Sequence, residues 1–172
     1  MRNKTTRRLM VVTSAVFGAL VISQSDAAAQ TATANLPVQA TVVANCNIDV
    51  PGTLNFGSYD PAVANAAADL DADTTIDVRC TKNSPNVWIG LDEGSNDNLG
   101  QRRMTDGSEF LNYDLYQDGG RTTVWGNLIG DGFSYAPATS SWTSLDVYGR
   151  VPQAQDVGVG TYNDTVLATI NF

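Results

Sequence analysis

Residues 31–48, TATANLPVQATVVANCNI, carry the clearest structural signal in the chain. Small or apolar side chains occupy every even position from Ala32 to Ile48, whereas the odd positions are polar apart from Pro37 and Val43. A period of two is the pattern of a half-buried β-strand. At roughly 3.3 Å per residue this stretch would extend over about 59 Å, whereas a typical strand has only about 5–6 residues. We therefore predict two consecutive strands that belong to different domains.

The C-terminal residues 161–172 repeat this alternation. Apolar side chains at even positions face one way, and the intervening side chains face the other; the even set is Val166, Ala168, Ile170 and Phe172. Two interpretations stay open. The strand either lies inside a sheet and is covered by its own domain, or it borders a gap that another molecule fills.

The composition excludes several classes of function. The 172 residues include 10 Lys and Arg, 18 Asp and Glu and no histidine, and the formal net charge is −8. This length fits one domain. The lack of histidine excludes a Ser-His-Asp triad, a Cys-His dyad and any histidine-ligated metal. The acidic balance argues against nucleic acid, because phosphate binding needs clustered Lys and Arg.

Residues 1–29 have the composition of a secretory signal peptide. A basic start is followed by the mostly apolar run Leu9–Ile22 and by Ala27-Ala28-Ala29, which is the order expected of such a peptide. The apolar run is short for a membrane span, although an N-terminal membrane anchor is the alternative. Cleavage after Ala29 leaves 143 residues with 6 basic and 17 acidic side chains, a net charge of −11. No later apolar run is long enough to span a bilayer, so we expect a soluble exported protein.

Export also bears on Cys46 and Cys80, the only cysteines of the chain. They do not form a C-x-x-C redox or zinc pattern. An oxidising compartment would join them, and the alternative is two free buried thiols. A bridge between them closes a loop of about 35 residues, for which the chain-entropy model gives about 4 kcal/mol.

The remaining sequence predicts strands and turns rather than helices. Val, Ile, Thr and Tyr are frequent, and Asp-Gly pairs mark turns. The alanine-rich run Ala62–Leu70 lacks large apolar residues, so we expect a loop or a short turn of helix there. Seven short strands and one disulfide suggest a β-sandwich, with no internal repeat. The predicted strands are Thr53–Phe56, Thr74–Cys80, Asn86–Leu91, Leu111–Gln117, Thr122–Trp125, Ser144–Val151 and Thr161–Phe172.

The chain resembles the spore coat protein U-type secreted pilins, the subunits of archaic chaperone–usher pili. Each matching segment is short, but together they run in order over almost the whole mature chain. The sequence departs from the usual pattern at Asp69–Asp73 and at Ala154-Gln155-Asp156, both in predicted loops. The matching segments are Ala44-Asn45-Cys46 with Ile48, Leu54–Tyr59, Ile76–Thr81, Arg103-Met104, Leu111–Tyr116, Val124-Trp125-Gly126, Val147–Pro152 and Gly160–Phe172.

The resemblance implies an all-β, incomplete immunoglobulin-like sandwich that lacks its last strand. In such pilins a periplasmic chaperone fills the resulting groove, and the N-terminal extension of the next subunit later replaces it by strand addition. The implied domains are a donor-strand extension at 30–43 and a pilin domain at 44–172. The implied donor side chains are Ala34, Leu36, Val38, Ala40 and Val42, and the implied groove wall is Val166, Ala168, Ile170 and Phe172.

Other chemistry has little support in the sequence. Asp69, Asp71 and Asp73 resemble the start of a calcium loop, but Thr74 replaces the expected glycine and Cys80 the closing glutamate, which favours an exposed acidic loop. The cluster Asp92, Glu93 and Asp97 could indicate a paired-carboxylate hydrolase. Five aromatic residues could line a sugar-binding face, although sandwich core is the simpler role; they are Tyr113, Tyr116, Trp125, Tyr135 and Trp142.

We therefore expect a non-enzymatic structural subunit without cofactor or metal. It would pass through the periplasm and an outer-membrane usher, join neighbouring pilins into a head-to-tail homopolymer on the cell surface, and serve adhesion and biofilm formation. The alternative is a secreted binding module or tip adhesin that recognises a surface or glycan.

Overall fold

The structure, a computed structural model, describes residues 30–172. The signal peptide predicted at 1–29 lies outside the described residues. The chain divides after Gln39 into two units. Residues 30–39 contain neither helix nor strand, and their side chains are exposed. The second unit, Ala40–Phe172, contains every strand of the described chain and is called the body below.

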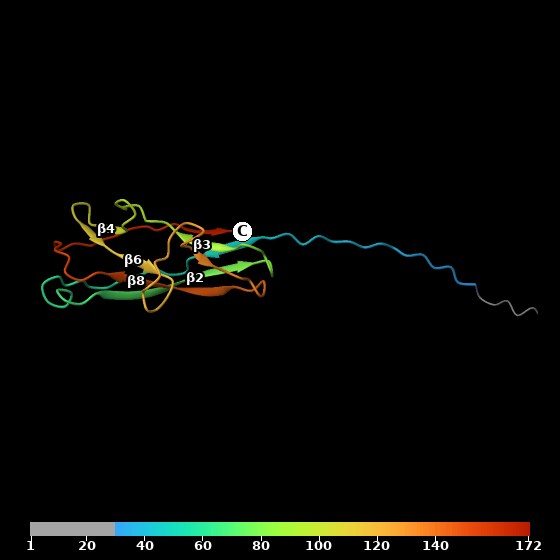
Figure 1. Cartoon of the computed structure of the whole chain (residues 1–172), viewed down its shortest axis with the longest axis horizontal. Helices are drawn as coiled ribbons and strands as arrows, with labels where there is room; N and C mark the ends of the chain where they lie inside the picture. Colours follow the sequence, from blue (N-terminus) through green and yellow to red (C-terminus); the bar gives the residue numbers. More distant parts are fainter. Residues whose placement is uncertain (1–29) are drawn as a thin grey trace, which may run out of the picture. The chain divides into compact units, whose positions relative to one another are not determined.

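Two antiparallel sheets make up most of the body. The larger has the strand order β1-β2-β8-β6 and the smaller β7-β3-β9, while β4 and β5 form a separate hairpin. In Figure 1 the long strands β2 and β8 run together along one side, and β3 lies with the C-terminal segment on the other. The strands are β1 (Cys46–Asp49), β2 (Leu70–Cys80), β3 (Trp88–Leu91), β4 (Arg103–Thr105), β5 (Phe110–Asn112), β6 (Asp114–Tyr116), β7 (Phe133–Ser134), β8 (Thr143–Val151) and β9 (Ala168–Asn171).

The hydrophobic core lies between the sheets. Trp125 is fully buried, and its indole N–H donates to the carbonyl of Ile89 over 2.8 Å. The other side chains of this buried cluster come from both sheets and their connections: Ile76, Val78, Ile89, Leu91, Leu111, Tyr113, Leu115, Leu145, Val147 and Val151. The predicted all-β sandwich is thus confirmed. In residues 30–172 there is no helix that could cross a membrane.

Arg102 is a buried cation that holds the end of β3. It is 3% exposed, and its guanidinium donates to the carbonyls of Leu91, Asp92 and Trp125 at 2.7–2.8 Å. Desolvation lowers the pKa of Arg102 from its ordinary value. Three backbone acceptors therefore satisfy a side chain that would otherwise be costly to bury.

Strand β2 begins at Leu70, four residues before the predicted start. The acidic segment expected as a loop instead pairs with β8, and Leu70 lies opposite Val151. Arginines on the outer face of the sheet neutralise it: the Arg150 Nε lies 2.8 Å from the Asp71 carboxylate, and the Arg121 Nη2 lies 2.5 Å from that of Asp73. The loop prediction for this segment was wrong because it rested on the acidic composition alone, which does not show that arginines lie beside these carboxylates in the fold.

Other predicted strands are shorter or broken. Leu111–Gln117 divides at Tyr113 into β5, which pairs with β4, and β6, which pairs with β8, because the chain changes sheets there. Thr122–Trp125 retains only an isolated bridge between Val124 and Tyr116. Sequence reasoning also missed β4 and β7, which are too short to show a period.

The two longest alternating stretches form the least regular structure. Of residues 31–48, only Cys46–Ile48 lie in a strand, and of Thr161–Phe172 only Ala168–Asn171 do. The predicted strand Thr53–Phe56 is also not one. These stretches have strand sequences but lack a neighbour within the described chain that could complete a ladder.

The alanine-rich run Ala62–Leu70 forms a turn, as predicted, except that its last residue begins β2. The Asp60 carboxylate accepts hydrogen bonds from the amides of Ala62 and Val63, and the Asp60 carbonyl accepts one from Asn65. The run forms no helix.

Candidate functional site: an open groove between two chain segments

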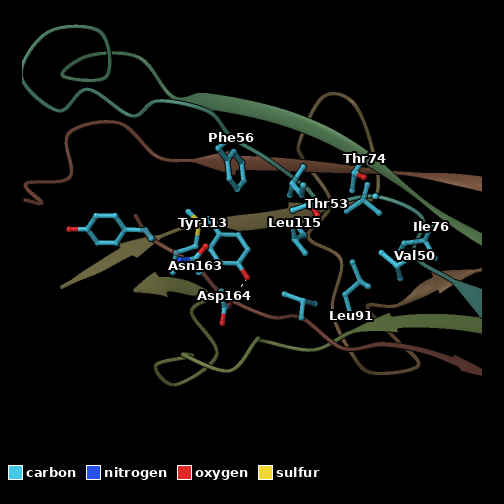
Figure 2. Close-up of a pocket in the computed structure, with 16 residues that line it drawn as sticks. Val50, Thr53, Phe56, Thr74, Ile76, Leu91, Tyr113, Leu115, Asn163 and Asp164 are labelled. Carbon is cyan, nitrogen blue, oxygen red and sulfur yellow. Dashed lines mark hydrogen bonds between the residues drawn. The ribbon is translucent and has the colours of Figure 1, made fainter. Parts of the chain in front are cut away.

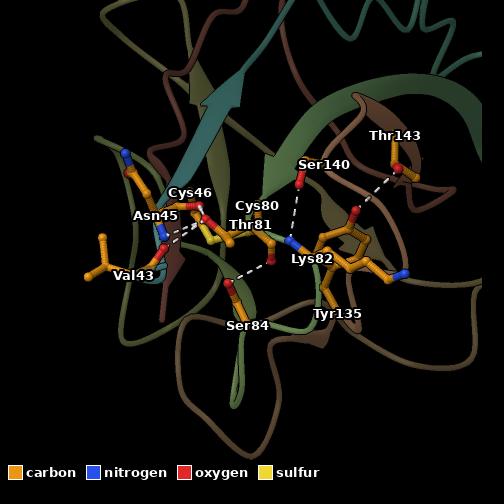
Figure 3. The surroundings of a disulfide bond; sticks show 10 residues. All are labelled: Val43, Asn45, Cys46, Cys80, Thr81, Lys82, Ser84, Tyr135, Ser140 and Thr143. Atoms are coloured by element: carbon orange, nitrogen blue, oxygen red, sulfur yellow. Dashed lines mark hydrogen bonds between the residues drawn. A yellow bond between two sulfur atoms is a disulfide. The ribbon is translucent and has the colours of Figure 1, made fainter. Parts of the chain in front are cut away.

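A disulfide joins the start of the body to its central sheet. Cys46 and Cys80 are opposite each other in the β1–β2 ladder, and their sulfurs are 2.00 Å apart. Thr81 reinforces the junction, because its hydroxyl donates to the carbonyl of Val43 and accepts from the amide of Asn45, each over 3.1 Å (Figure 3). The predicted disulfide is present, and it anchors the chain near the end of the long alternating stretch 31–48.

One wall of the groove is the C-terminal segment that leads into β9, of which residues 157–164 and Val166 line the groove. Its odd residues turn their backbone groups toward the body: Asn163 exchanges hydrogen bonds with Thr105, and the carbonyls of Thr165 and Leu167 accept from Ser95 and Asp92. Within residues 30–172, β9 pairs only with β3. By the alternation of a strand, the backbone groups of the even residues therefore face the opposite, unpaired edge.

The opposite wall is the segment 50–59, which follows β1 without entering a sheet. Leu54 and Phe56 turn inward and pack against the core, while Asn55 between them is exposed. Their contact point is the bare backbone of Gly149, where an added Cβ would lie 2.6 Å from the Leu54 side chain. The segment thus has strand-like alternation but is held by side chains alone.

Between these walls the core is open to solvent. Two connected hollows of about 290 and 610 Å³ share Leu54, Phe56, Met104 and Tyr162. The first reaches down to Ile76, Leu91 and Leu115, which Figure 2 shows pointing into it; the second ends at Leu70, Leu111 and Val157. Together the two hollows form a long groove with an apolar floor, lined along the C-terminal segment by residues 157–164 and Val166 and called the groove below.

A carboxylate interrupts this apolar lining. Asp164 accepts a hydrogen bond from the Tyr113 hydroxyl at 2.7 Å (Figure 2). It also accepts from the Ser95 amide at 3.0 Å and from the Asn96 side-chain amide at 2.8 Å. Burial and the hydrogen bond to Asp164 both raise the pKa of the Tyr113 hydroxyl, which therefore stays protonated and remains a donor. Asp164 thus fixes the wall in place while presenting a polar spot to the groove.

A polar network closes one end of the groove. The Tyr59 hydroxyl donates to the carbonyl of Pro152 and accepts from the amide of Gln155, whose side chain bridges to both backbone groups of Asn112. Gln155 belongs to a segment that departs from the usual pilin pattern. Here it has a clear structural role, because it joins three segments at the end of the groove.

The predicted groove residues lie in different environments. Val166, Ala168 and Ile170 are half-buried and pack against the core, whereas Phe172 is 57% exposed. Of these four residues only Val166 lines the groove. The predicted donor residues are all exposed, with Leu36 at 84% and Val42 at 82%; the others are Ala34, Val38 and Ala40. Sequence reasoning did not assign Asp164 or Gln155 to the groove, and it considered Tyr113 only as a sugar-binding or core aromatic, since only the fold brings the three together.

The alternative sites gain no support. Among residues 30–172 no group of His, Cys, Asp or Glu is arranged to hold a metal ion. The Asp92 carboxylate accepts hydrogen bonds from the amides of Gly94 and Leu167 and so joins its own loop to the C-terminal segment. Of the five candidate sugar-binding aromatics, Tyr113 and Trp125 are buried in the core, whereas Trp142 is 48% exposed and lies under the guanidinium of Arg79.

Comparison with known proteins agrees with the resemblance seen in the sequence. The model of the Spore Coat Protein U domain matches residues 32–169. Protein U of Myxococcus xanthus is 41% identical over 174 aligned positions, which cover 94% of this chain and 96% of that protein.

A solved structure shares the fold. It is a chain in the crystal structure of the CsuC–CsuE chaperone–tip adhesion subunit pre-assembly complex from archaic chaperone–usher Csu pili of Acinetobacter baumannii, with a TM-score of 0.55 and 23% identity. The match covers 77% of this chain but only 41% of that chain. The family match over most of the sequence, the close relative and the antiparallel two-sheet body agree: the chain belongs to the spore coat protein U domain family.

Proposed function

We propose that the protein is a structural subunit of a chaperone–usher surface pilus that polymerises by donor-strand complementation. The observation that carries the proposal is the groove, whose apolar floor and unpaired strand edge belong to one and the same body. A groove of this kind accepts an extended strand, because main-chain hydrogen bonds and alternate side-chain pockets are then satisfied together.

The matching strand is the extension, residues 30–43. Its even side chains are apolar and exposed, and burying Leu36, Val38 and Val42 contributes about 1.5–3 kcal/mol each before ordering costs. The extension of one copy in the groove of the next is a heterologous contact, which generates a fibre rather than a closed ring. The groove wall in this assembly consists of Val166, Ala168 and Ile170, with Phe172 at its end.

The partners follow from this assembly. A periplasmic chaperone covers the groove before polymerisation, because an exposed apolar cleft and a free strand edge promote aggregation. An outer-membrane usher then secretes the growing fibre. The chain is exported by its signal peptide, and the finished pilus at the cell surface serves adhesion and biofilm formation.

The test is deletion of residues 31–42 in the chain expressed with the chaperone and usher of its own host. We expect the shortened chain to fold and to co-purify with the chaperone, but to form no fibres in electron micrographs. The matched controls replace Leu36, Val38 and Val42 by Ser in one variant and the odd-position Thr33, Gln39 and Thr41 by Ser in another. Only the first should lose fibres. Normal fibres from the shortened chain would overturn the proposal.

A further inference from the structure

We propose a specific register for the inserted strand: residue 40 of one copy lies opposite Asp164 of the next, in antiparallel orientation. This inference rests on the proposed function and specifies how its two surfaces fit. Every pairing in the body is antiparallel, and antiparallel ladders are slightly more stable than parallel ones. An antiparallel insertion therefore continues the geometry of the sheet that ends at β9.

The parity of the register follows from the unpaired edge. Even residues of the segment 162–170 direct their backbone groups to this edge, because the odd residues Asn163, Thr165 and Leu167 use theirs to bond the body. Before β9 the even side chains are half-buried and the odd ones exposed, whereas in β9 Thr169 is half-buried as well. The apolar side chains of the extension are also at even positions. Even residues must therefore lie opposite even residues. Pro37, at an odd position, then turns its missing N–H away from the β9 edge.

Within this parity, residue size and charge select one register. Asp164 already accepts three hydrogen bonds, and pressing a branched apolar side chain onto it would strip the carboxylate of its remaining water. Alanine at position 40 leaves that space open. Three of the neighbouring pairs then combine a large with a small side chain or two valines: Ala34 with Ile170, Leu36 with Ala168, and Val38 with Val166. The fourth places Val42 beside the ring of Tyr162.

Shifted registers fit worse. A shift of two residues in either direction places Val38 or Val42 against Asp164. A shift of four one way places Leu36 there. A shift of six the same way brings Ala34 to Asp164, but it leaves Ile170 opposite residue 28, which belongs to the predicted signal peptide. A shift of four the other way brings Cys46 opposite Tyr162, inside the groove, although Cys46 is held in β1 of its own body by the disulfide.

The occupant must be a second copy. Cys46 pairs with Cys80 at one end of the sheet, and the short loop 81–87 leads from there to Trp88, which pairs with Asn171. The start of β1 and the end of β9 thus lie at the same end of the body, as Figure 1 shows. In the proposed register residue 42 lies opposite Tyr162, roughly 30 Å along the strand from the end of β9, where Cys46 lies. An extended chain from residue 42 to residue 46 spans only about 13 Å, so a molecule cannot place its own extension in its own groove in this register.

Disulfide trapping tests the register on the exposed odd face. In the proposed register Gln39 lies opposite Thr165 at a site without mutual hydrogen bonds, where Cα atoms are about 4.5 Å apart and a disulfide fits. The variant Gln39→Cys with Thr165→Cys should give a ladder of covalent multimers on gels without reductant, and the ladder should disappear with reductant. The matched controls pair Gln39→Cys with Asn163→Cys or with Leu167→Cys, at diagonal distances of roughly 7–8 Å that do not allow a bridge.

The outcomes separate the register from the proposed function. A ladder from either control pair would overturn the register while leaving strand exchange intact. Normal fibres that give no ladder with any of the three variants would do the same. Should Gln39→Cys with Thr165→Cys fail to assemble, Thr33→Cys with Asn171→Cys samples the same register and decides by the same criterion. Wild-type chain that forms no fibres with its chaperone and usher would instead contradict the proposed function.

Discussion

Strand β8 and the extension have the same alternating pattern, but their apolar side chains are in opposite environments. In β8 the side chains of Val147 and Val151 are 3% and 0% exposed, whereas Leu36 and Val38 in the extension are 84% and 88% exposed. The difference is the neighbour: β8 lies between β2 and β6 in its sheet, and the extension has no strand partner in the described chain. Alternation therefore indicates that a strand will be half-buried, but not in whose sheet.

The largest expected effect comes from placing a charge in each region. Val147→Asp buries a carboxyl group in the core and should destabilise the body by roughly 4–8 kcal/mol, through lost packing and desolvation. Val38→Asp should leave the unfolding of the monomer unchanged within about 0.5 kcal/mol, because the side chain is exposed there. Urea unfolding of both purified variants measures this difference.

The same pair of variants should reverse in assembly. Val38→Asp is expected to fold and bind chaperone but form no fibres, since the carboxylate would enter the apolar groove. Equal losses of monomer stability in the two variants would show that the extension is already buried in its own molecule.

The next effect concerns the junction between the two regions. Replacing both Cys46 and Cys80 by Ala should lower the free energy of unfolding of the body by about 4 kcal/mol, because a loop of about 35 residues is no longer closed in the unfolded chain. Reduced wild-type protein is the matched control, and urea midpoints are compared. An unchanged midpoint would mean that the bridge restrains the extension rather than the body.

The smallest effect lies on the outer, polar face of β2 and β8. The hydrogen bond from Arg150 lowers the pKa of Asp71, so the ionised form stabilises the fold. This contribution is present above the ordinary pKa of an aspartate and is lost as the pH falls through the lower, folded value. Asp71→Asn should cost only about 0.3–1 kcal/mol at neutral pH.

The measurement is thermal unfolding as a function of pH, with Asp97→Asn as the control, since Asp97 is exposed and belongs to none of the ion pairs found within residues 30–172. Asp71→Asn should flatten the acid limb of the profile relative to this control. Identical pH profiles of the two variants would show that the Asp71–Arg150 ion pair does not stabilise the start of β2.

Much of the body could be predicted from the sequence, because local patterns decide it. The long strands β2 and β8 follow from period-two runs of β-branched residues, and the disulfide from two cysteines in an exported chain. The acidic start of β2 could not be predicted, since its partners Arg121 and Arg150 are distant in sequence. The break at Tyr113 also depends on a tertiary event, because the chain changes sheets there.

The groove shows the same division. Alternation at residues 31–48 and 161–172 predicted two strands that need neighbours, and the family resemblance supplied the kind of neighbour. The carboxylate of Asp164, the tyrosine that fixes it and the closed end at Tyr59 and Gln155 emerged only from the folded chain.

By itself, the sequence determined the β-architecture, the disulfide and the two alternating stretches that need a further strand neighbour. The reason is that strand period and cysteine pairing are local or nearly local properties. The tertiary structure decided that one edge of β9 stays unpaired, that the segment 50–59 stands apart from the sheets, and that a carboxylate lies in an apolar groove. These features depend on which segments come into contact in the fold, and the periodicity of the sequence does not show contacts between distant segments.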